Sequence, residues 1–156
     1  MPQKNIKVHA ITNTVKGIAK KITTPIEIKD VFTDKVIQTK GLWDTGATGS
    51  VITKSMASVL GLRSFGKRKV RGVHGENEVN VYYVNITLDN KNITINAQVT
   101  ECEELSVDKS VGCLIGMNII TMGDFSITNF GGHTTMSFRV PSIQKIDYIR
   151  GMQAEK

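Results

Sequence analysis

The sequence predicts a mostly β protein in a single domain that spans residues 1–156. Three observations lead to this prediction. Apolar and polar residues alternate in runs rich in Val, Ile, Thr and Tyr, which is typical of half-buried strands. Turn-forming residues separate these runs, and few segments have helical periodicity. A chain of 156 residues with 40% hydrophobic and 22% charged residues can bury a core without disulfide bonds.

Seven segments have the alternation expected of strands, namely residues 6–12, 26–31, 36–43, 82–88, 93–100, 125–129 and 134–140. Residues 50–60 place apolar side chains at roughly helical spacing before Gly61, so a helix is expected there. A second, short helix is expected at residues 118–122. Residues 69–81 contain two glycines within a strand-like pattern, which predicts a hairpin with its bend near residues 74–76.

The most informative string is LWDTGATGS at residues 42–50. Because an ionised carboxylate is costly to bury without partners, Asp44 is either a hydrogen-bonded turn residue or a functional group. Asp-Thr-Gly alone occurs by chance in about one chain of this length in thirty. Its context is more specific, because an apolar strand precedes it, a helical pattern follows it, and a second motif, Leu114-Ile115-Gly116, lies far downstream.

With these features the sequence resembles the retropepsin-like (retroviral-type) aspartic proteases over about residues 26–140. That family has an apolar strand leading into Asp-Thr-Gly-Ala, then a hairpin flap, and later two apolar residues and a glycine before a short helix. The resemblance implies a closed β-barrel with one or two short helices that acts as a twofold homodimer. Only one Asp-Thr-Gly occurs in the chain, so each subunit is expected to supply half of the active site.

The resemblance also implies a role for each residue of the first motif. Asp44 and its symmetry mate would share one proton and activate a water molecule, hydrolysing an extended peptide without a metal or a cofactor. Thr45 would hydrogen-bond across the dimer axis, and Gly46 would leave room for the substrate backbone. Ala47 lacks the hydroxyl that acid-adapted members carry, which favours activity at weakly acidic to neutral pH.

The flap is expected at Gly72, Val73, His74 and Gly75, where it would close over the bound peptide. Since the aspartic mechanism needs no imidazole, His74 is interpreted as a flap-tip residue rather than a base. The other two histidines show no ligand spacing, and no metal site is predicted. Viral members commonly carry an acid and an arginine where this chain has Thr48 and Met117, so dimer strength and substrate preference do not transfer.

The formal net charge of +6 is concentrated partly in the basic cluster at Arg63, Lys67, Arg68, Lys69 and Arg71. This cluster could attract phosphate or an acidic substrate, or it could be a solvated loop. Nucleic-acid binding is not favoured, because the aromatic platforms that usually accompany it are missing.

The sequence has no apolar run long enough to span a membrane and no recognisable secretion signal, so a cytoplasmic location is expected. The two cysteines, Cys102 and Cys113, fit neither a disulfide framework nor a zinc spacing. Both are interpreted as reduced and structural.

Two other functions stay open at this point. One keeps the fold without the chemistry, as a dimerisation or peptide-binding module, and the other is a basic β-barrel that binds nucleic acid. The dimer contact is expected from a terminal strand, either near residues 6–10 or at residues 134–140, which would add to a sheet of the second copy. The C-terminal hairpin is the favoured candidate.

Overall fold

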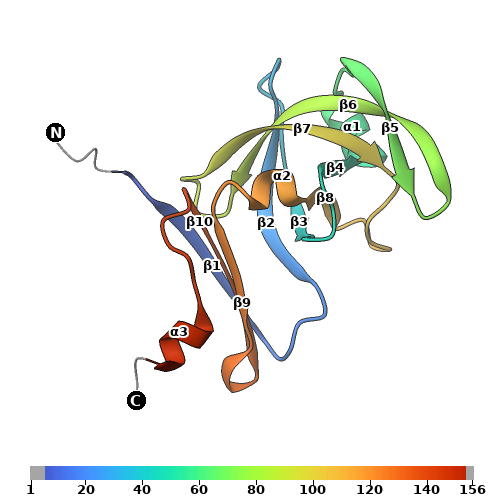
Figure 1. The fold of residues 1–156 in the computed structure, drawn as a ribbon. Helices are drawn as coiled ribbons and strands as arrows, with labels where there is room; N and C mark the ends of the chain where they lie inside the picture. Colours follow the sequence, from blue (N-terminus) through green and yellow to red (C-terminus); the bar gives the residue numbers. More distant parts are fainter. Residues whose placement is uncertain (1–5, 154–156) are drawn as a thin grey trace.

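The computed structural model describes residues 6–153 and confirms the mostly β architecture (Figure 1). In chain order the elements are β1 (His9–Lys16), β2 (Ile22–Asp30), β3 (Val36–Trp43), β4 (Ser50–Thr53), α1 (Lys54–Leu60), β5 (Gly66–Gly72), β6 (Gly75–Leu88), β7 (Thr94–Cys102), β8 (Val111–Ile115), α2 (Met117–Ile120), β9 (Asp124–Thr128), a single 3-10 turn (Phe130–Gly132), β10 (His133–Val140) and α3 (Tyr148–Gln153). The helices are short, so the strands determine the shape.

Six strands close a barrel in the order β2-β3-β8-β4-β7-β6, and β6 pairs back onto β2. The pairs β3–β8 and β4–β7 are parallel, whereas the other pairs in the barrel are antiparallel. Strand β5 pairs only with the first half of β6, and the two form a hairpin that projects from the barrel (Figure 1). The closed barrel that the family resemblance implied is therefore present.

A separate three-stranded sheet, ordered β1-β10-β9, lies on the other side of the molecule from this hairpin (Figure 1). Strand β1 pairs with β10 over its whole length, and β9 pairs with the opposite edge of β10. Because β10 has partners on both sides, residues 134–140 have no free edge to offer a second copy. The prediction that residues 134–140 themselves add to a partner's sheet is therefore wrong, whereas β9 of the same C-terminal hairpin has a free edge, as does β1.

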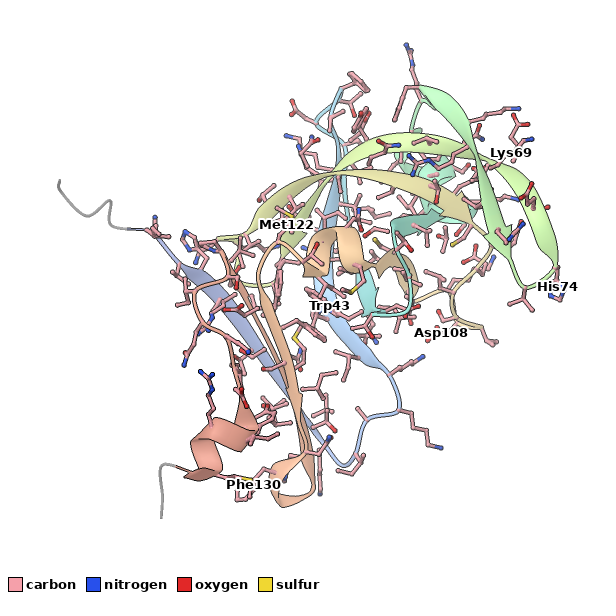
Figure 2. The ribbon with its side chains drawn as sticks, viewed as in Figure 1. Trp43, Lys69, His74, Asp108, Met122 and Phe130 are labelled. Atoms are coloured by element: carbon pink, nitrogen blue, oxygen red, sulfur yellow. The ribbon has the colours of Figure 1, made fainter. Side chains whose placement is uncertain are left out.

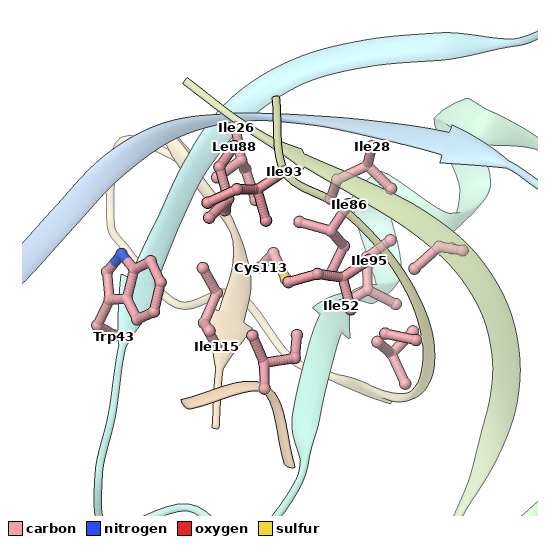
Figure 3. Packing of buried hydrophobic residues seen from close by; sticks show 14 of the residues in the cluster. Ile26, Ile28, Trp43, Ile52, Ile86, Leu88, Ile93, Ile95, Cys113 and Ile115 are labelled. Atoms are coloured by element: carbon pink, nitrogen blue, oxygen red, sulfur yellow. The ribbon is translucent and has the colours of Figure 1, made fainter. Parts of the chain in front are cut away.

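The core follows from the period-two alternation of the strands (Figure 3). In β6, Val84, Ile86 and Leu88 are completely buried and alternate with the more exposed Asn85 and Thr87. Each fully buried aliphatic side chain contributes about 1.5–3 kcal/mol of transfer free energy. Residues from β2, β4, β7 and β8 fill the rest of the barrel interior.

Trp43, the last residue of β3, joins the barrel to the three-stranded sheet. Its Nε1 donates a hydrogen bond to Oγ1 of the buried Thr24 at 2.9 Å. Its ring stacks on Phe125 with centroids 5.3 Å apart and contacts the tilted ring of Phe138 at 5.0 Å. The strand end that precedes Asp44 is therefore fixed from both sheets.

The prediction of one helix over residues 50–60 is wrong in its first part. Residues 50–53 form β4, which pairs with β7 and β8, and the helix begins only at Lys54. Thr53 caps the helix, since its Oγ1 accepts a hydrogen bond from Met56 N at 3.2 Å. Sheet pairing with distant segments has overridden the local helical spacing.

Most of the other predicted elements are present with shifted ends. The strand at residues 36–43 is correct, the strand at 6–12 is observed as His9–Lys16, and residues 82–88 are the second half of the long strand β6. The short helix predicted at residues 118–122 is observed as Met117–Ile120. Helix α3 was not predicted.

Within residues 6–153, no helix is both long and apolar enough to cross a membrane. The cytoplasmic location stays a prediction. So does the single domain over residues 1–156, whose first five and last three residues lie outside the described part of the chain.

Candidate active site

The fold brings the two sequence motifs together at one end of the barrel. Strands β3 and β8 run parallel, with Leu42 opposite Leu114 and Trp43 opposite Ile115. Asp44 N then donates a hydrogen bond to Ile115 O at 2.9 Å. The acid therefore leaves the sheet directly beside the second motif.

The loop that follows holds the Asp44 carboxylate in one orientation. Gly46 N donates to Asp44 Oδ1 at 2.8 Å, and Ala47 N donates to Asp44 O at 3.3 Å. Asp44 is half-buried, whereas Thr45 and Gly46 are exposed. Among residues 6–153, no hydrogen-bond donor reaches the second carboxylate oxygen, Oδ2.

Backbone hydrogen bonds fasten this loop to the start of α2. Met117 N donates to Ala47 O at 2.8 Å, and Asn118 N donates to Thr48 O at 3.1 Å. These two bonds replace the intrahelical partners that the first N–H groups of a helix lack. The end of the Asp44 loop and the turn after the second motif therefore form one unit.

A buried serine completes the connection between the two motifs. Ser50 Oγ accepts a hydrogen bond from Gly116 N at 3.0 Å and donates one to Asn118 Oδ1 at 2.8 Å. A Cβ atom on Gly116 would lie 2.3 Å from Gly49 O, which is closer than a carbon can approach. The last position of Leu114-Ile115-Gly116 therefore requires glycine because the Asp44 loop passes directly over it.

A groove of about 650 Å³ lies beside the loop. Residues 46–51 form one part of its lining, and strand β5 forms another. The remaining lining residues are Gln98, Thr100 and Asn118. None of the residues that line the groove carries a carboxylate.

The four residues predicted as the flap form the end of the β5–β6 hairpin (Figure 2). Gly72 and Gly75 pair with each other across the turn, and Gly75 has φ 110°, a backbone conformation that favours glycine. Val73 is 98% exposed, and Figure 2 shows His74 at the far end of the hairpin. None of these four residues lines the groove in a single copy of the chain.

The residues that do line it from the hairpin are Arg68, Val70 and Arg71, which the sequence analysis did not include in the site. Residues 67–71 lie in strand β5, so the interpretation of the basic cluster as a loop is wrong for this part. Strand alternation could not have identified the cations that line the groove, because it places Arg68 and Arg71 on opposite faces of the strand although both line the groove.

The cysteines lie outside this site, and their surroundings keep them protonated. Burial raises the pKa of Cys113 to about 12 and the pKa of the partly buried Cys102 to about 11. Both are free thiols. In the part of the chain that the structure describes, no three His, Cys, Asp or Glu side chains are grouped so that they could hold a metal ion.

Comparisons with known proteins agree with this geometry. The model of an aspartyl protease family matches residues 25–119. The fold is similar to that of a retropepsin-like aspartic protease from Rickettsia conorii, with TM-score 0.54, 15% identity, and 86% of this chain and 96% of that one covered. It is also similar to the retroviral protease-like domain of Ddi1 from Leishmania major, with TM-score 0.50, 17% identity, and coverages of 83% and 99%. No curated protein matches the chain significantly in sequence. The protein therefore belongs to the aspartyl protease family and has the retropepsin-like fold that the sequence motifs predicted.

Proposed function

We propose that the protein is an aspartic endopeptidase that hydrolyses peptide bonds as a homodimer, with a water molecule held between two Asp44 side chains. The observation that carries this proposal is the Asp44 loop, which orients one carboxylate at the barrel end through Gly46 N. The chain has a single Asp-Thr-Gly, and the adjacent groove has no carboxylate in its lining. The second acid therefore has to come from another copy.

Two such carboxylates about 3 Å apart cannot both ionise cheaply, so they share one proton. The ionised acid takes a proton from the water, and the protonated acid donates a hydrogen bond to the scissile carbonyl oxygen. The exposed Thr45 is available to bond across the dimer axis. At Gly46 a Cβ atom would lie 3.1 Å from Asp44 Oδ1, so glycine keeps the carboxylate uncovered.

The three-stranded sheet supports a dimer contact close to the acids. Trp43 packs on Phe125 and Phe138 of this sheet, so the sheet is fixed to the strand that leads into Asp44. The apolar face of the sheet continues to Val15 and Ile127, which are 42% and 43% exposed in a single copy. The edges of β1 and β9 remain available for strand pairing. A second copy that covers this region would bring the two Asp44 loops together.

Cleavage of an unfolded protein substrate by the full chain tests the proposal. Wild type should cleave, a statine-type inhibitor should block cleavage, and Asp44→Asn should lower kcat/KM by at least about 10³-fold. The matched control is Asp89→Asn, which removes an exposed acid from the β6–β7 turn and should leave cleavage unchanged.

Equal activity of Asp44→Asn and wild type would contradict the proposal. A stable dimer that binds peptide without cleaving it would instead support the unused module, and salt-sensitive DNA binding without cleavage would support the nucleic-acid barrel. In the proposed enzyme Ala47 places no hydroxyl beside the acids, so the rate should be highest at weakly acidic to neutral pH. A maximum near pH 3 would argue against this role of Ala47.

A further inference from the structure

The two faces of the β5–β6 hairpin differ in how their charges are balanced. Residues directly opposite each other in an antiparallel pair share one face of the sheet. Lys69 lies opposite Glu78 and Arg71 lies opposite Glu76, whereas Arg68 lies opposite Val79. Arg68 is therefore on the face that has an apolar neighbour instead of an acid.

Two of the other cations of the hairpin form ion pairs. Arg71 Nη2 lies 3.5 Å from Glu76 Oε1, and Lys67 Nζ lies 3.9 Å from Glu78 Oε1. Within residues 6–153, no carboxylate lies within ion-pair distance of Arg68. Its positive charge is not compensated by the protein's described residues.

Arg68 also lines the groove beside the Asp44 loop, together with Val70 and Arg71. The other polar side chains of the lining are neutral and include Gln98, Thr100 and Asn118. A guanidinium matches a carboxylate in geometry, since two parallel N–H groups can bond to its two oxygens. The groove thus presents a guanidinium that no acid among the described residues occupies.

We propose that this groove binds an acidic side chain of the substrate, so that the enzyme prefers peptides with Asp or Glu near the cleaved bond, and that Arg68 determines this specificity. The inference rests on the proposed function, because the groove is taken as part of the peptide-binding cleft. Val70 lies beside Arg68 in the lining and packs against the aliphatic part of the bound residue.

Matched peptides test the inference. A single cleaved sequence is varied with Glu, Gln or Lys at each position around the scissile bond, and kcat/KM is measured at low ionic strength, where charge effects are screened least. At one position the wild type should prefer Glu over Gln by about tenfold, the size of an exposed charge-assisted hydrogen bond. Arg68→Gln should abolish this preference by lowering kcat/KM for the Glu peptide more than for the Gln peptide, and Arg68→Glu should reverse it in favour of Lys.

The control is Lys67→Gln, which makes the same change in net charge on the opposite face of the hairpin. It should keep most of the Glu preference. An equal loss in Arg68→Gln and Lys67→Gln would mean that only the overall field matters, and this would overturn the inference. So would a wild type that shows no Glu preference at any position.

A binding measurement separates the failure of this inference from the failure of the proposed function. Fluorescence anisotropy compares a labelled Thr-Glu repeat peptide with its Thr-Gln counterpart on Asp44→Asn, with and without Arg68→Gln. If no peptide is cleaved but the acidic peptide binds through Arg68, the proposed function fails and the acidic site stands. If peptides are cleaved but neither assay depends on Arg68, the acidic site fails and the protease stands. If nothing is cleaved or bound, both fail.

Discussion

The Asp44 loop and the β5–β6 hairpin lie on two sides of one groove and are held in different ways. The loop is fastened by hydrogen bonds from Gly46, Met117 and Asn118, and it is packed directly against Gly116. In the hairpin, residues 66–78 are exposed except for the half-buried Val70, and the strand ladder supplies most of the bonds. Segments with few buried contacts open at low free-energy cost. We call the rigid Asp44 loop the floor of the groove and the β5–β6 hairpin, which can be displaced at little cost, its lid.

The glycines beside the Asp44 loop and in the hairpin differ in how tightly they are packed. A Cβ on Gly116 would meet Gly49 O at 2.3 Å, whereas a Cβ on Gly72 would have no atom within 4 Å. Gly116 is required by close packing, and Gly72 is not. Variants at these two positions therefore measure the difference between floor and lid directly.

The largest expected effect is that of Gly116→Ala. The added methyl group must displace the Asp44 loop, so the free energy of unfolding should fall by at least about 3 kcal/mol and cleavage should be lost. Urea unfolding monitored by Trp43 fluorescence measures the change. The matched control, Gly72→Ala, should change stability by less than about 1 kcal/mol. Equal losses in the two variants would show that the loop and the hairpin tolerate an added methyl group equally.

A smaller effect is expected for Ser50→Ala. Removing this hydroxyl leaves Gly116 N without an acceptor in a buried place, which costs about 1–3 kcal/mol. Catalysis should fall as well, since the two motifs lose their link. Ser64→Ala serves as the control, because Ser64 is exposed and its hydrogen bonds within the described residues are to nearby Gly66, so the unfolding midpoint of the variant should stay close to that of wild type. A Ser50→Ala protein as stable as the control would show that the link is dispensable.

The segment after β10 is hydrogen-bonded to the Asp124 carboxylate, so its attachment depends on pH. We expect this attachment to be weaker than that of the floor and stronger than that of the lid. Ser142 Oγ, Ile143 N and Arg139 Nε all donate hydrogen bonds to Asp124, and they lower its pKa well below the usual range. A group with a depressed pKa stabilises the fold fully above its unfolded pKa of about 4 and loses that contribution as the pH falls further. Asp124→Asn should therefore be less stable than wild type at pH 7.

The stability difference between wild type and Asp124→Asn should shrink as the pH is lowered below about 4, because protonation then removes the charge in wild type as well. Urea midpoints of both proteins between pH 2 and pH 7 give this curve. A gap that stays constant over the whole range would show that the Asp124 charge has no part in holding the segment.

The smallest expected effect is that of thiol alkylation. Cys113 lies in the core beneath the floor, and burial raises its pKa to about 12, so at pH 8 it is protonated as well as inaccessible. Cys102 is only partly buried, with its pKa raised to about 11, and should react slowly. Iodoacetamide should leave cleavage unchanged, with mass spectrometry reporting which cysteine is modified. Rapid modification of Cys113 in the native protein would show that the core opens easily and that the floor above it is not rigid.

Much of the floor was predictable, since its signals are local. The strand at residues 36–43 alternates clearly and ends at Asp44, and the second motif stands out as an apolar pair followed by glycine. The helix over residues 50–60 was only half correct, because residues 50–53 are taken into the sheet by strands far away in sequence. Pairing of this kind cannot be seen in a local pattern.

The lid side of the site was less predictable for a related reason. Strand β5 has one apolar residue, Val70, among glycines and cations, so its alternation carries no hydrophobic signal. The hairpin itself could be expected from Gly72 and Gly75, but which side chains it places along the groove depends on how it folds over the barrel. Arg68 therefore became a site residue only through the tertiary structure.

Subunit mixing tests whether one active site needs the Asp44 of two copies. Wild type and Asp44→Asn are unfolded together, refolded at a fixed total concentration in varied proportions, and tested for peptide cleavage. If each mixed dimer is inactive, activity falls as the square of the wild-type fraction and an equal mixture retains about one quarter of full activity. A linear fall, with about one half retained, would mean that each chain works alone and would contradict the account.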